Sequence, residues 1–410
     1  MPRLDGYAVL RQRDYRRFWL GQWISLIGTW MQSAAQGWLL IKLTDSPMWL
    51  GALGAAAGAP LLVFVLVGGV ASERFDRRRI ILCTQFLSLL QALVLSLLTL
   101  AGHIQPWQIV GLAAVLGSVN AFDVPARQAF VVELVGPERV GNAIALNSSA
   151  FNVARVIGPA IGGLVVAAVG EGYCFLLNAV SYVAVLWSLA SIRPRFRSLR
   201  QFDGEGGTAV VEGLRYVVRH PSIGPLLLLV GVISSVGVPY RNFLPAMARL
   251  VGANDWQYGL LIAAAGVGAS LGGLSLAAFR MGRDAYQRLL PVSVGFFSLM
   301  LLAFATTHGY RLALLVLTVV GVSGILYFNC TNALIQLSVE DGYRGRVMSV
   351  YTLMHQGMAT FGNLMLGWAA SRWGTPTALV MGALTCLAAA GVFIAMQTSR
   401  VRFPTPAIET

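Results

Sequence analysis

Apolar stretches of about 20 residues recur along the whole chain, and short polar connections separate them. The hydrocarbon core of a bilayer is about 30 Å thick, which an α-helix of about 20 residues can cross. Backbone N–H and C=O groups inside that core must be bonded within the segment, so long and uniformly apolar runs indicate helices, not barrel strands. Charged residues make up only 11% of the chain, too few for a water-facing surface. The sequence therefore predicts an all-α membrane protein.

Hydropathy predicts twelve transmembrane helices. The expected spans are 18–41, 47–71, 80–101, 107–125, 142–169, 173–192, 222–247, 256–279, 289–307, 311–336, 346–370 and 376–397. If the N-terminus is cytoplasmic, most of the 30 lysines and arginines fall in cytoplasmic connections, which is what the positive-inside rule requires. An even number of spans then returns the C-terminus to the cytoplasm.

The two halves of the chain repeat one another at an offset of about 204 residues. Gly158 and Gly163 align with Gly362 and Gly367 at this offset, and further residues align in other connections. A duplicated unit predicts two pseudo-symmetric six-helix bundles that form a clamshell. The expected domains are an N-terminal bundle at 1–195, a cytoplasmic linker at 196–221 and a C-terminal bundle at 222–410.

The linker contains an apolar helical face around Leu214 and Val217, with Glu212 and Arg215 elsewhere on the helix. This pattern is typical of a helix that lies along a membrane surface. A mobile linker with slight helicity remains the alternative.

The connection after the second span begins with a glycine, and an acid and several arginines follow it. This pattern resembles motif A of the major facilitator superfamily, although Asp76 replaces the second glycine of that motif. The resemblance implies a gate that holds the two bundles together at the cytoplasmic face. The expected gating residues are Gly69, Glu73, Arg74, Arg77, Arg78, Asp123 and Arg127. We expect Glu73 and its arginines to contact the fourth and eleventh spans in the outward-open state, with Arg127 as the charged partner of Glu73 or Asp123.

The fifth span contains a proline among glycines, which resembles motif C of the same superfamily. Proline removes a backbone hydrogen bond and bends a helix, while glycines allow a neighbouring helix to approach closely. The expected bend residues are Gly158, Pro159, Gly162 and Gly163. An ordinary kinked packing helix is the alternative interpretation.

Finer resemblance covers nearly the whole chain and indicates the drug and siderophore exporters of the superfamily. It is carried by Arg13–Arg17, Leu43–Pro47, Asp123–Gln128 and Arg344–Ser349, among other segments. The resemblance implies export from the cytoplasm across a bacterial inner membrane, with protons as the coupling partner. We expect a monomer that contacts membrane lipids, takes a small-molecule substrate and does not bind nucleic acid.

Polar side chains inside the spans are costly in hydrocarbon, so they should face one another or a central substrate cavity. The candidate cavity residues are Gln32, Gln36, Asn152, Arg155, Tyr240, Arg241, Asn329, Asn332, His355 and Gln356. For each uncharged residue, an interhelical hydrogen bond is the alternative. Arg155 is different, because a buried guanidinium needs an acidic or carbonyl partner. Arginines and amides without a central acid suit neutral or anionic amphiphiles.

The candidate proton carriers are His355 and Asp123. His355 is the one histidine predicted within a span, and histidine titrates near neutral pH. Asp123 is expected at the cytoplasmic end of the fourth span, which leaves no carboxylate in the middle of any span. A simple ion pair with Arg127, four residues further on, is the alternative role of Asp123.

Other function classes find little support. The chain has no nucleotide-binding loop, so the energy should come from a gradient. Four dispersed histidines and four isolated cysteines predict neither a metal site nor a cofactor, and we do not expect an enzyme. A lipid or lysophospholipid flippase of the same fold remains the alternative function.

Overall fold

The computed structural model describes residues 8–192, 206–220, 222–278 and 281–399, and every regular element within them is helical. The first bundle contains α1 (Arg13–Thr44), α2 (Pro47–Arg74), α3 (Arg77–Leu100), α4 (Pro106–Val135), α5 (Val140–Val169) and α6 (Glu171–Ala190). The predicted domain boundary at 195 and 196 lies outside the described residues, and the exact domain limits stay a prediction.

The second bundle also has six membrane-length segments, two of which are composite. They are α8–η3–α9 (Ile223–Val236, Val238–Phe243 and Leu244–Leu250), α10 (Asp255–Ala278), α11 (Arg283–Ala305), α12 (Tyr310–Ser338), α13–η5–α14 (Arg344–Thr352, Leu353–Gly357 and Met358–Trp373) and α15 (Thr375–Ser399). The short helices η1 (Ala8–Arg11), η2 (Pro137–Arg139) and η4 (Asp341–Tyr343) lie in connections. The prediction of twelve spanning segments is thus confirmed.

Ten of these segments are long and apolar enough to cross a membrane by composition alone. The other two are α1 and α13–η5–α14, which carry more polar side chains. The prediction of continuous helices for the seventh and eleventh spans is wrong in detail. A 3-10 turn interrupts one at Val238–Phe243, where Pro239 lacks a backbone donor, and a π-turn interrupts the other at Leu353–Gly357.

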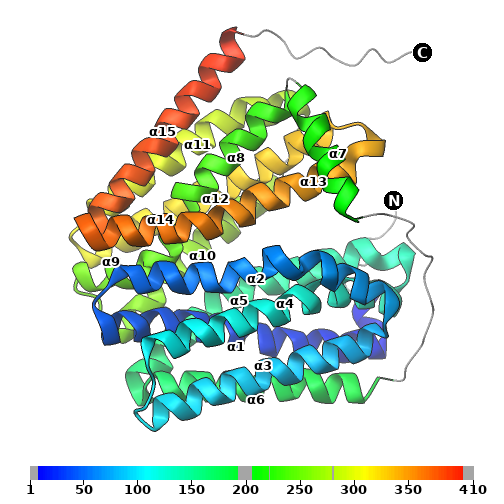
Figure 1. Cartoon of the computed structure of the whole chain (residues 1–410), viewed down its shortest axis with the longest axis vertical. Coiled ribbons are helices and arrows are strands. Elements are labelled where there is room, and N and C mark those ends of the chain that lie inside the picture. The colour runs from blue at the N-terminus through cyan, green and yellow to red at the C-terminus, as the bar shows by residue number, and fades with distance from the viewer. Residues whose placement is uncertain (1–7, 193–205, 221, 279–280, 400–410) are drawn as a thin grey trace.

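The same packing pattern occurs in both bundles (Figure 1). In the first, α1 packs on α5 and α6, α2 on α4, and α3 on α4 and α6. In the second, α8 packs on α14 and α15, α10 on α12, and α11 on α12 and α15. Two seams join the bundles, α5 with α10 and α2 with α14. The predicted pseudo-symmetry is confirmed.

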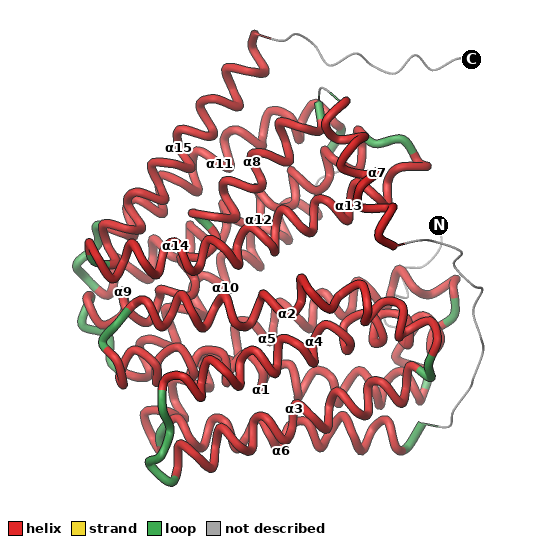
Figure 2. The backbone as a smooth tube through the Cα atoms, in the orientation of Figure 1, coloured by secondary structure: helices red, strands yellow, loops and turns green. Residues whose placement is uncertain are grey.

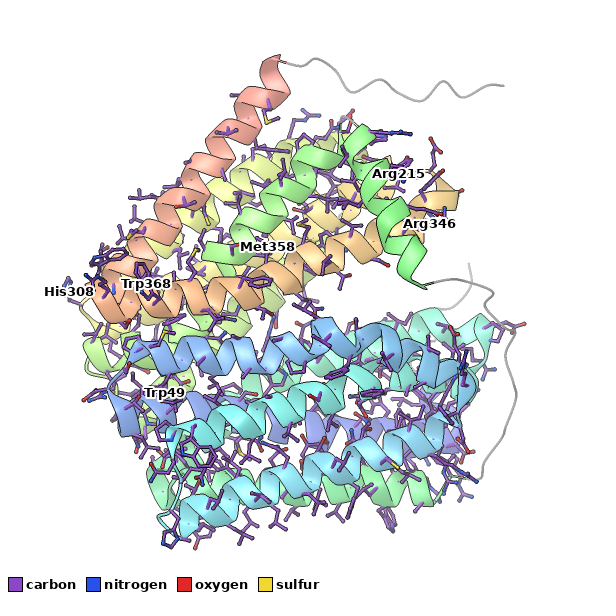
Figure 3. All side chains as sticks on the ribbon, viewed as in Figure 1. Trp49, Arg215, His308, Arg346, Met358 and Trp368 are labelled. Carbon is purple, nitrogen blue, oxygen red and sulfur yellow. The ribbon has the colours of Figure 1, made fainter. Side chains whose placement is uncertain are left out.

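The bundles lie closest at the end that carries α9 and diverge toward the end that carries α7 (Figures 1 and 2). We call the latter the arginine-rich end, because the α2–α3 connection with Arg74 and Arg77–Arg79 lies there. The opposite end holds the α1–α2 connection at Asp45 and the α9–α10 connection. Figure 3 places Arg215 and Arg346 at the arginine-rich end, and Trp49, His308 and Trp368 at the opposite end.

Glycines permit the close approach of the bundles near the opposite end. A Cβ added to Gly259 of α10 would lie 2.4 Å from the Pro159 carbonyl oxygen, and one on Gly163 would lie 3.0 Å from the Gly259 Cα. In the second seam, a Cβ on Gly51 of α2 would lie 2.9 Å from the Gly367 Cα. Gly163 and Gly367, equivalent in the repeat, therefore both serve inter-bundle seams.

The linker helix α7 (Gly206–Arg219) docks on the second bundle at the arginine-rich end. Its Glu212 pairs with Arg346 of α13 at 3.2 Å, and the Tyr216 ring stacks on Tyr343 with centroids 4.4 Å apart. Val217 is buried, whereas Val218 is 79% exposed. Part of the apolar face therefore packs on protein, and contact of the exposed part with a membrane surface stays a prediction.

Candidate functional site

The residues of the α2–α3 connection tie the first bundle to itself. The Asp76 carboxylate caps α3 by accepting from the Arg78 and Arg79 backbone N–H groups. Arg77 forms an ion pair with Glu133 near the end of α4, and its Nε donates to the Ser72 carbonyl. Arg78 donates to the Leu189 carbonyl near the end of α6 at 2.9 Å, where the helix dipole favours a cation.

Glu133 is the acid that the sequence interpretation missed. It lies ten residues beyond Asp123 in a stretch that was predicted to be a loop, so no spacing rule linked it to Arg77. Glu73 and Arg74 are exposed, and neither forms an ion pair within the described residues. Arg77 and Arg78 thus contact α4 and α6 of their own bundle, and Gly69 has open space around it.

Replacing Arg77 by glutamine is expected to destabilise the protein. Both partners are largely buried, with side chains 12% and 18% exposed, so the change leaves the Glu133 carboxylate uncompensated. We expect a loss of about 2 kcal/mol in the free energy of unfolding, measured by thermal melting in detergent. Arg79→Gln is the matched control, because Arg79 is 85% exposed and its ion pair should contribute less than about 1 kcal/mol. Equal melting of the two variants would contradict the structural role of Arg77.

Asp123 lies inside the first bundle, not at the end of a span as predicted. Helix α4 continues through Pro125 to Val135, so a carboxylate does lie within a membrane helix. Asp123 is 1% exposed and accepts hydrogen bonds from Thr84 at 2.7 Å and Gln85 at 3.0 Å. It also pairs with Arg127, as the i,i+4 spacing suggested. Arg127 then donates to Gln22 of α1 at 2.9 Å, which links three helices.

Gln32 and Gln36 of α1 are both buried. The Gln32 amide donates to the Gln91 side chain of α3 at 3.1 Å and accepts from Asn178 of α6 at 2.8 Å. These interhelical hydrogen bonds are the alternative that the sequence left open. In this structure Gln32 therefore contacts α3 and α6 of its own bundle, and its role in a cavity stays a prediction, as does that of Gln36.

The remaining candidate cavity residues come from both bundles. Asn152 and Arg155 lie on α5, and the Arg155 guanidinium donates to the Asn152 side chain at 3.1 Å. Arg241 is exposed on η3, with its Cζ 5.9 Å from the centroid of the Tyr240 ring, while Tyr240 itself is buried against Phe297. Arg155 and Arg241 belong to different bundles, and neither forms an ion pair among the described residues.

The second bundle adds an aromatic and amide surface. The centroid of the His355 ring of η5 lies 5.0 Å from that of Phe328 of α12 and 6.3 Å from that of Tyr351. Asn329 and Asn332 are half-buried on α12, and Asn332 accepts from Gln336 at 2.6 Å. Gln356 is exposed beside His355.

The four predicted bend residues are all buried in helix contacts. A Cβ on Gly158 would lie 2.8 Å from the Ile27 carbonyl oxygen of α1, and one on Gly162 would lie 3.1 Å from Met31. The equivalent Gly362 packs in the same way on Ser235 of α8, with a Cβ distance of 2.0 Å to its carbonyl oxygen. Helix α5 continues through Pro159, and its role in bending stays a prediction.

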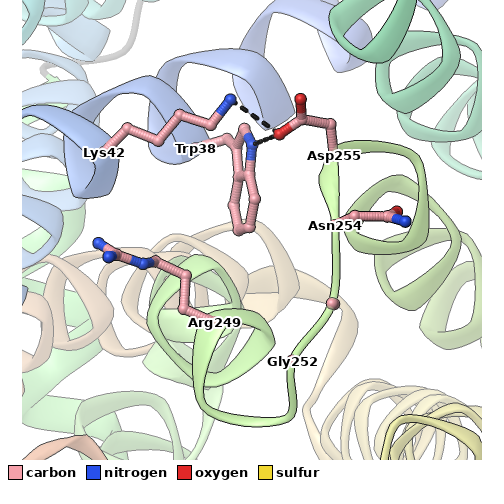
Figure 4. Close-up of a pocket in the computed structure, with 7 residues that line it drawn as sticks. Trp38, Lys42, Arg249, Gly252, Asn254 and Asp255 are labelled. Atoms are coloured by element: carbon pink, nitrogen blue, oxygen red, sulfur yellow. Dashed lines mark hydrogen bonds and ion pairs between the residues drawn. The ribbon is translucent and has the colours of Figure 1, made fainter.

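A cluster of charges and rings joins the bundles at the opposite end (Figure 4). We call Trp38, Lys42, Glu171, Asp255 and Tyr258 the Lys42 cluster. The Lys42 ammonium lies 2.8 Å from Glu171 of its own bundle and 2.7 Å from Asp255 of the other. The Trp38 indole N–H donates to Asp255 at 2.7 Å, and its ring stacks on Tyr258 with centroids 4.5 Å apart.

Arg249 of α9 adds a second connection beside the cluster, because it pairs with Asp45 and donates to the Ile41 carbonyl at 3.1 Å. Trp38, Lys42, Arg249 and Asp255 line a cavity of about 470 Å³. The sequence interpretation used Lys42 and Arg249 only to count loop charges. The signal that it passed over was the one lysine of the chain at the end of the first span, with acids at the starts of two later helices.

Comparison with known proteins identifies relatives along the full length. A family model described as transmembrane secretion effector matches residues 4–405. The staphyloferrin A transporter of Staphylococcus aureus is 22% identical over 92% of this chain and 95% of that protein. The enterobactin exporter EntS of Salmonella choleraesuis is 24% identical over 86% and 84%, and the multidrug efflux pump Tap of Mycolicibacterium fortuitum is 23% identical over 80% and 82%.

Solved structures with the same fold cover almost the whole chain. The nucleoside transporter NupG superposes with a TM-score of 0.76 at 12% identity, over 94% of this chain and 99% of NupG. A bacterial homologue of the lysosomal transporter Spinster gives a TM-score of 0.74 at 14% identity, over 94% and 96%. The membrane architecture described above is therefore shared with transporters.

Proposed function

The chain belongs to the transmembrane secretion effector family of the major facilitator superfamily, and from this premise we propose that it exports small amphiphilic molecules, siderophore-like or drug-like, across a bacterial inner membrane. The observation that carries the proposal is that the bundles meet closely at one end only. An alternating-access carrier needs two ends that close in turn around a central site.

We assign the arginine-rich end to the cytoplasm, because cytoplasmic connections of membrane proteins are enriched in lysine and arginine. The seams and the Lys42 cluster then close the outer face, and the state is open to the cytoplasm. This is the state from which an exporter loads its substrate. Both termini are then assigned to the cytoplasm. The proposed domains are the first bundle at 1–195, the linker at 196–221 and the second bundle at 222–410. The carrier is proposed to act as a monomer.

Proton coupling is proposed to use the buried carboxylate of Asp123 or the imidazole of His355. Asp123 is the better supported of the two, because its contacts link α1, α3 and α4 through Thr84, Gln85 and Arg127. A change in its charge would alter the packing of three helices together. His355 lies against the rings of Phe328 and Tyr351 in the second bundle.

The function is tested by measuring the accumulation of siderophores, macrolides and dyes in cells with and without the protein, before and after a protonophore. We expect lower accumulation of at least one compound in cells with the protein, and the protonophore should abolish the difference. Labelled lysophospholipid in the same panel tests the flippase alternative. Equal accumulation of every compound would overturn the export proposal.

Glu73 is proposed to close the inner face in the outward-open state, near the N-terminus of α13, where the helix dipole favours an acid. Glu73→Gln should therefore slow transport severalfold without reducing the amount of protein in the membrane, since the side chain is exposed and forms no ion pair with the described residues in this state. Transport of the panel compound is compared with that of Glu138→Gln, which alters an exposed acid in the α4–α5 connection. A wild-type transport rate in Glu73→Gln would contradict the proposed role of Glu73 in closing the inner face.

A further inference from the structure

A line of buried polar side chains runs through the first bundle and begins at Asp123. Thr84 and Gln85 of α3 donate to the Asp123 carboxylate at 2.7 and 3.0 Å, and Ser88 and Gln91 follow on the same face of α3. We use the name polar line for Thr84, Gln85, Ser88 and Gln91 of α3, Gln32 and Gln36 of α1, and Asn178 of α6, each of which is at most 5% exposed.

The polar line passes from α3 to α1 and α6 through direct hydrogen bonds. The Gln91 side-chain oxygen accepts from Gln32 at 3.1 Å, and Gln32 accepts in turn from Asn178 at 2.8 Å. Gln36 follows Gln32 by one helical turn. Further along α1 lies Lys42 of the proposed outer face. The polar line thus leads from the buried carboxylate toward the outer face.

The length of the polar line matches most of the thickness of a membrane. At 1.5 Å per residue, α3 from Thr84 to Gln91 spans about 10 Å, and α1 from Gln32 to Lys42 spans about 15 Å. Both helices run from the arginine-rich end to the opposite end, and Gln91 meets Gln32, so the two lengths add. The hydrocarbon core is about 30 Å thick.

Three amides of the polar line have a buried atom without a hydrogen-bond partner among the described residues. They are Gln85, through its Oε1, and Gln91 and Gln36, through their Nε2 atoms. A buried polar atom without a partner is unfavourable, and internal water is what bridges such atoms in proteins. One acceptor and two donors suit water, because a water molecule both donates and accepts. These atoms therefore indicate internal water along the line.

The second bundle packs in the same way without such a line. At the offset of about 204 residues, the positions equivalent to the four glutamines and Ser88 hold Val236, Tyr240, Leu289, Val292 and Gly295. Helix packing in this fold therefore does not require glutamines at these positions. Polar side chains inside a membrane bundle are costly, and where they occur they mark ion and proton pathways.

Resting on the proposed use of Asp123 in proton coupling, we propose that the polar line holds a row of internal waters that conducts protons between the outer face and the Asp123 carboxylate. A proton that enters at the outer end passes from water to water by exchange of O–H bonds. The last water protonates a carboxylate oxygen of Asp123, which becomes neutral. The glutamine and asparagine amides keep their own protons and orient the waters.

One cation contacts this carboxylate among the described residues. It is Arg127 of α4, which also donates to Gln22 of α1, while α3 presents the neutral side chains of Thr84 and Gln85. Protonation therefore removes the charge that holds Arg127. The titratable side chains of the other packed helices, α2 and α5, form no ion pair or hydrogen bond with the carboxylate, and they are Glu73, Arg74 and Arg155.

The polar line is tested by the rate at which Asp123 takes up a proton. Full-length protein in lipid nanodiscs is followed by infrared spectroscopy after a rapid drop in pH, and the band of the protonated carboxyl group is assigned by its absence from Asp123→Asn. We expect Gln91→Leu and Ser88→Ala each to slow the appearance of this band by about tenfold, because each removes a group that holds a water. The final intensity should not change, since neither side chain donates to the carboxylate.

Ser88→Ala also guards against misfolding, because the Ser88 hydroxyl donates only to the Thr84 carbonyl of its own helix at 2.9 Å. The control is Ser96→Ala, which removes another buried hydroxyl of α3 that donates to the Gly172 carbonyl at 2.9 Å, away from the polar line. We expect a wild-type rate in this control.

Wild-type rates in both Gln91→Leu and Ser88→Ala, equal slowing by Ser96→Ala, or the absence of any band that depends on Asp123 would each overturn the pathway. The infrared rates are independent of the cellular accumulation assay. Protonophore-sensitive export together with unchanged infrared rates removes the pathway alone. Slowed protonation together with export that a protonophore does not affect removes the proposed proton coupling alone.

Discussion

Gly259→Leu is expected to reduce transport by about a hundredfold while the protein still reaches the membrane. The Cβ alone would lie 2.4 Å from the Pro159 carbonyl oxygen and 2.9 Å from the Gly163 Cα, both backbone atoms of the facing helix. The seam between α5 and α10 can then no longer close. Overpacking of this kind costs about 1–3 kcal/mol, and the upper value corresponds to about a hundredfold change in the population of the closed seam.

Gly111→Leu is the control for this prediction. Gly111 lies on the exposed face of α4, and an added Cβ would meet no atom within 4 Å. Transport of the panel compound is measured for both variants at equal protein levels in the membrane. Normal transport by Gly259→Leu would mean that this seam is not part of the transport cycle.

The second large effect is expected at the Lys42 cluster. Lys42→Gln leaves the Glu171 and Asp255 carboxylates together without a cation, so they repel across the outer face. Because both acids are partly buried, we expect the ratio of outward-open to inward-open protein to rise by about 10- to 100-fold. The measurement is the reaction of an impermeant maleimide with a cysteine placed at Ala253, which lines the cavity beside the cluster.

Lys42→Arg keeps the cation and should leave the labelling rate close to that of wild type. The exposed native Cys83 is replaced by serine in all variants, because it would react with the reagent. Equal labelling rates of Ala253→Cys with and without the Lys42→Gln substitution would contradict the role of the Lys42 cluster in closing the outer face.

Hydropathy was sufficient to predict the helices, because the thickness of the bilayer sets the length of a span and its apolar core requires helical backbone hydrogen bonds. The internal repeat then predicted the two bundles. The position of Asp123 was predicted incorrectly for a physical reason. The span expected from hydropathy ended at residue 125, yet α4 continues through Pro125 to Val135, since packing on α2 and α3 can sustain a helix through one missing hydrogen bond.

The candidate site was less accessible to sequence reasoning. A polar stripe on α1 shows that Gln32 and Gln36 share a face, but periodicity cannot say whether that face points into its own bundle or between the bundles. The Lys42 cluster was missed because its charges were used solely to orient the chain.

Opening of the two bundles at alternate ends is tested most directly by spin-label distances between Glu138 and Gly342 at the arginine-rich end and between His103 and His308 at the opposite end. All four positions are exposed, and each pair joins the two bundles. In a Cys83→Ser background, we expect Lys42→Gln to shorten the first distance and to lengthen the second relative to wild type. Two distances that change in the same direction, or that both stay fixed, would contradict alternate opening.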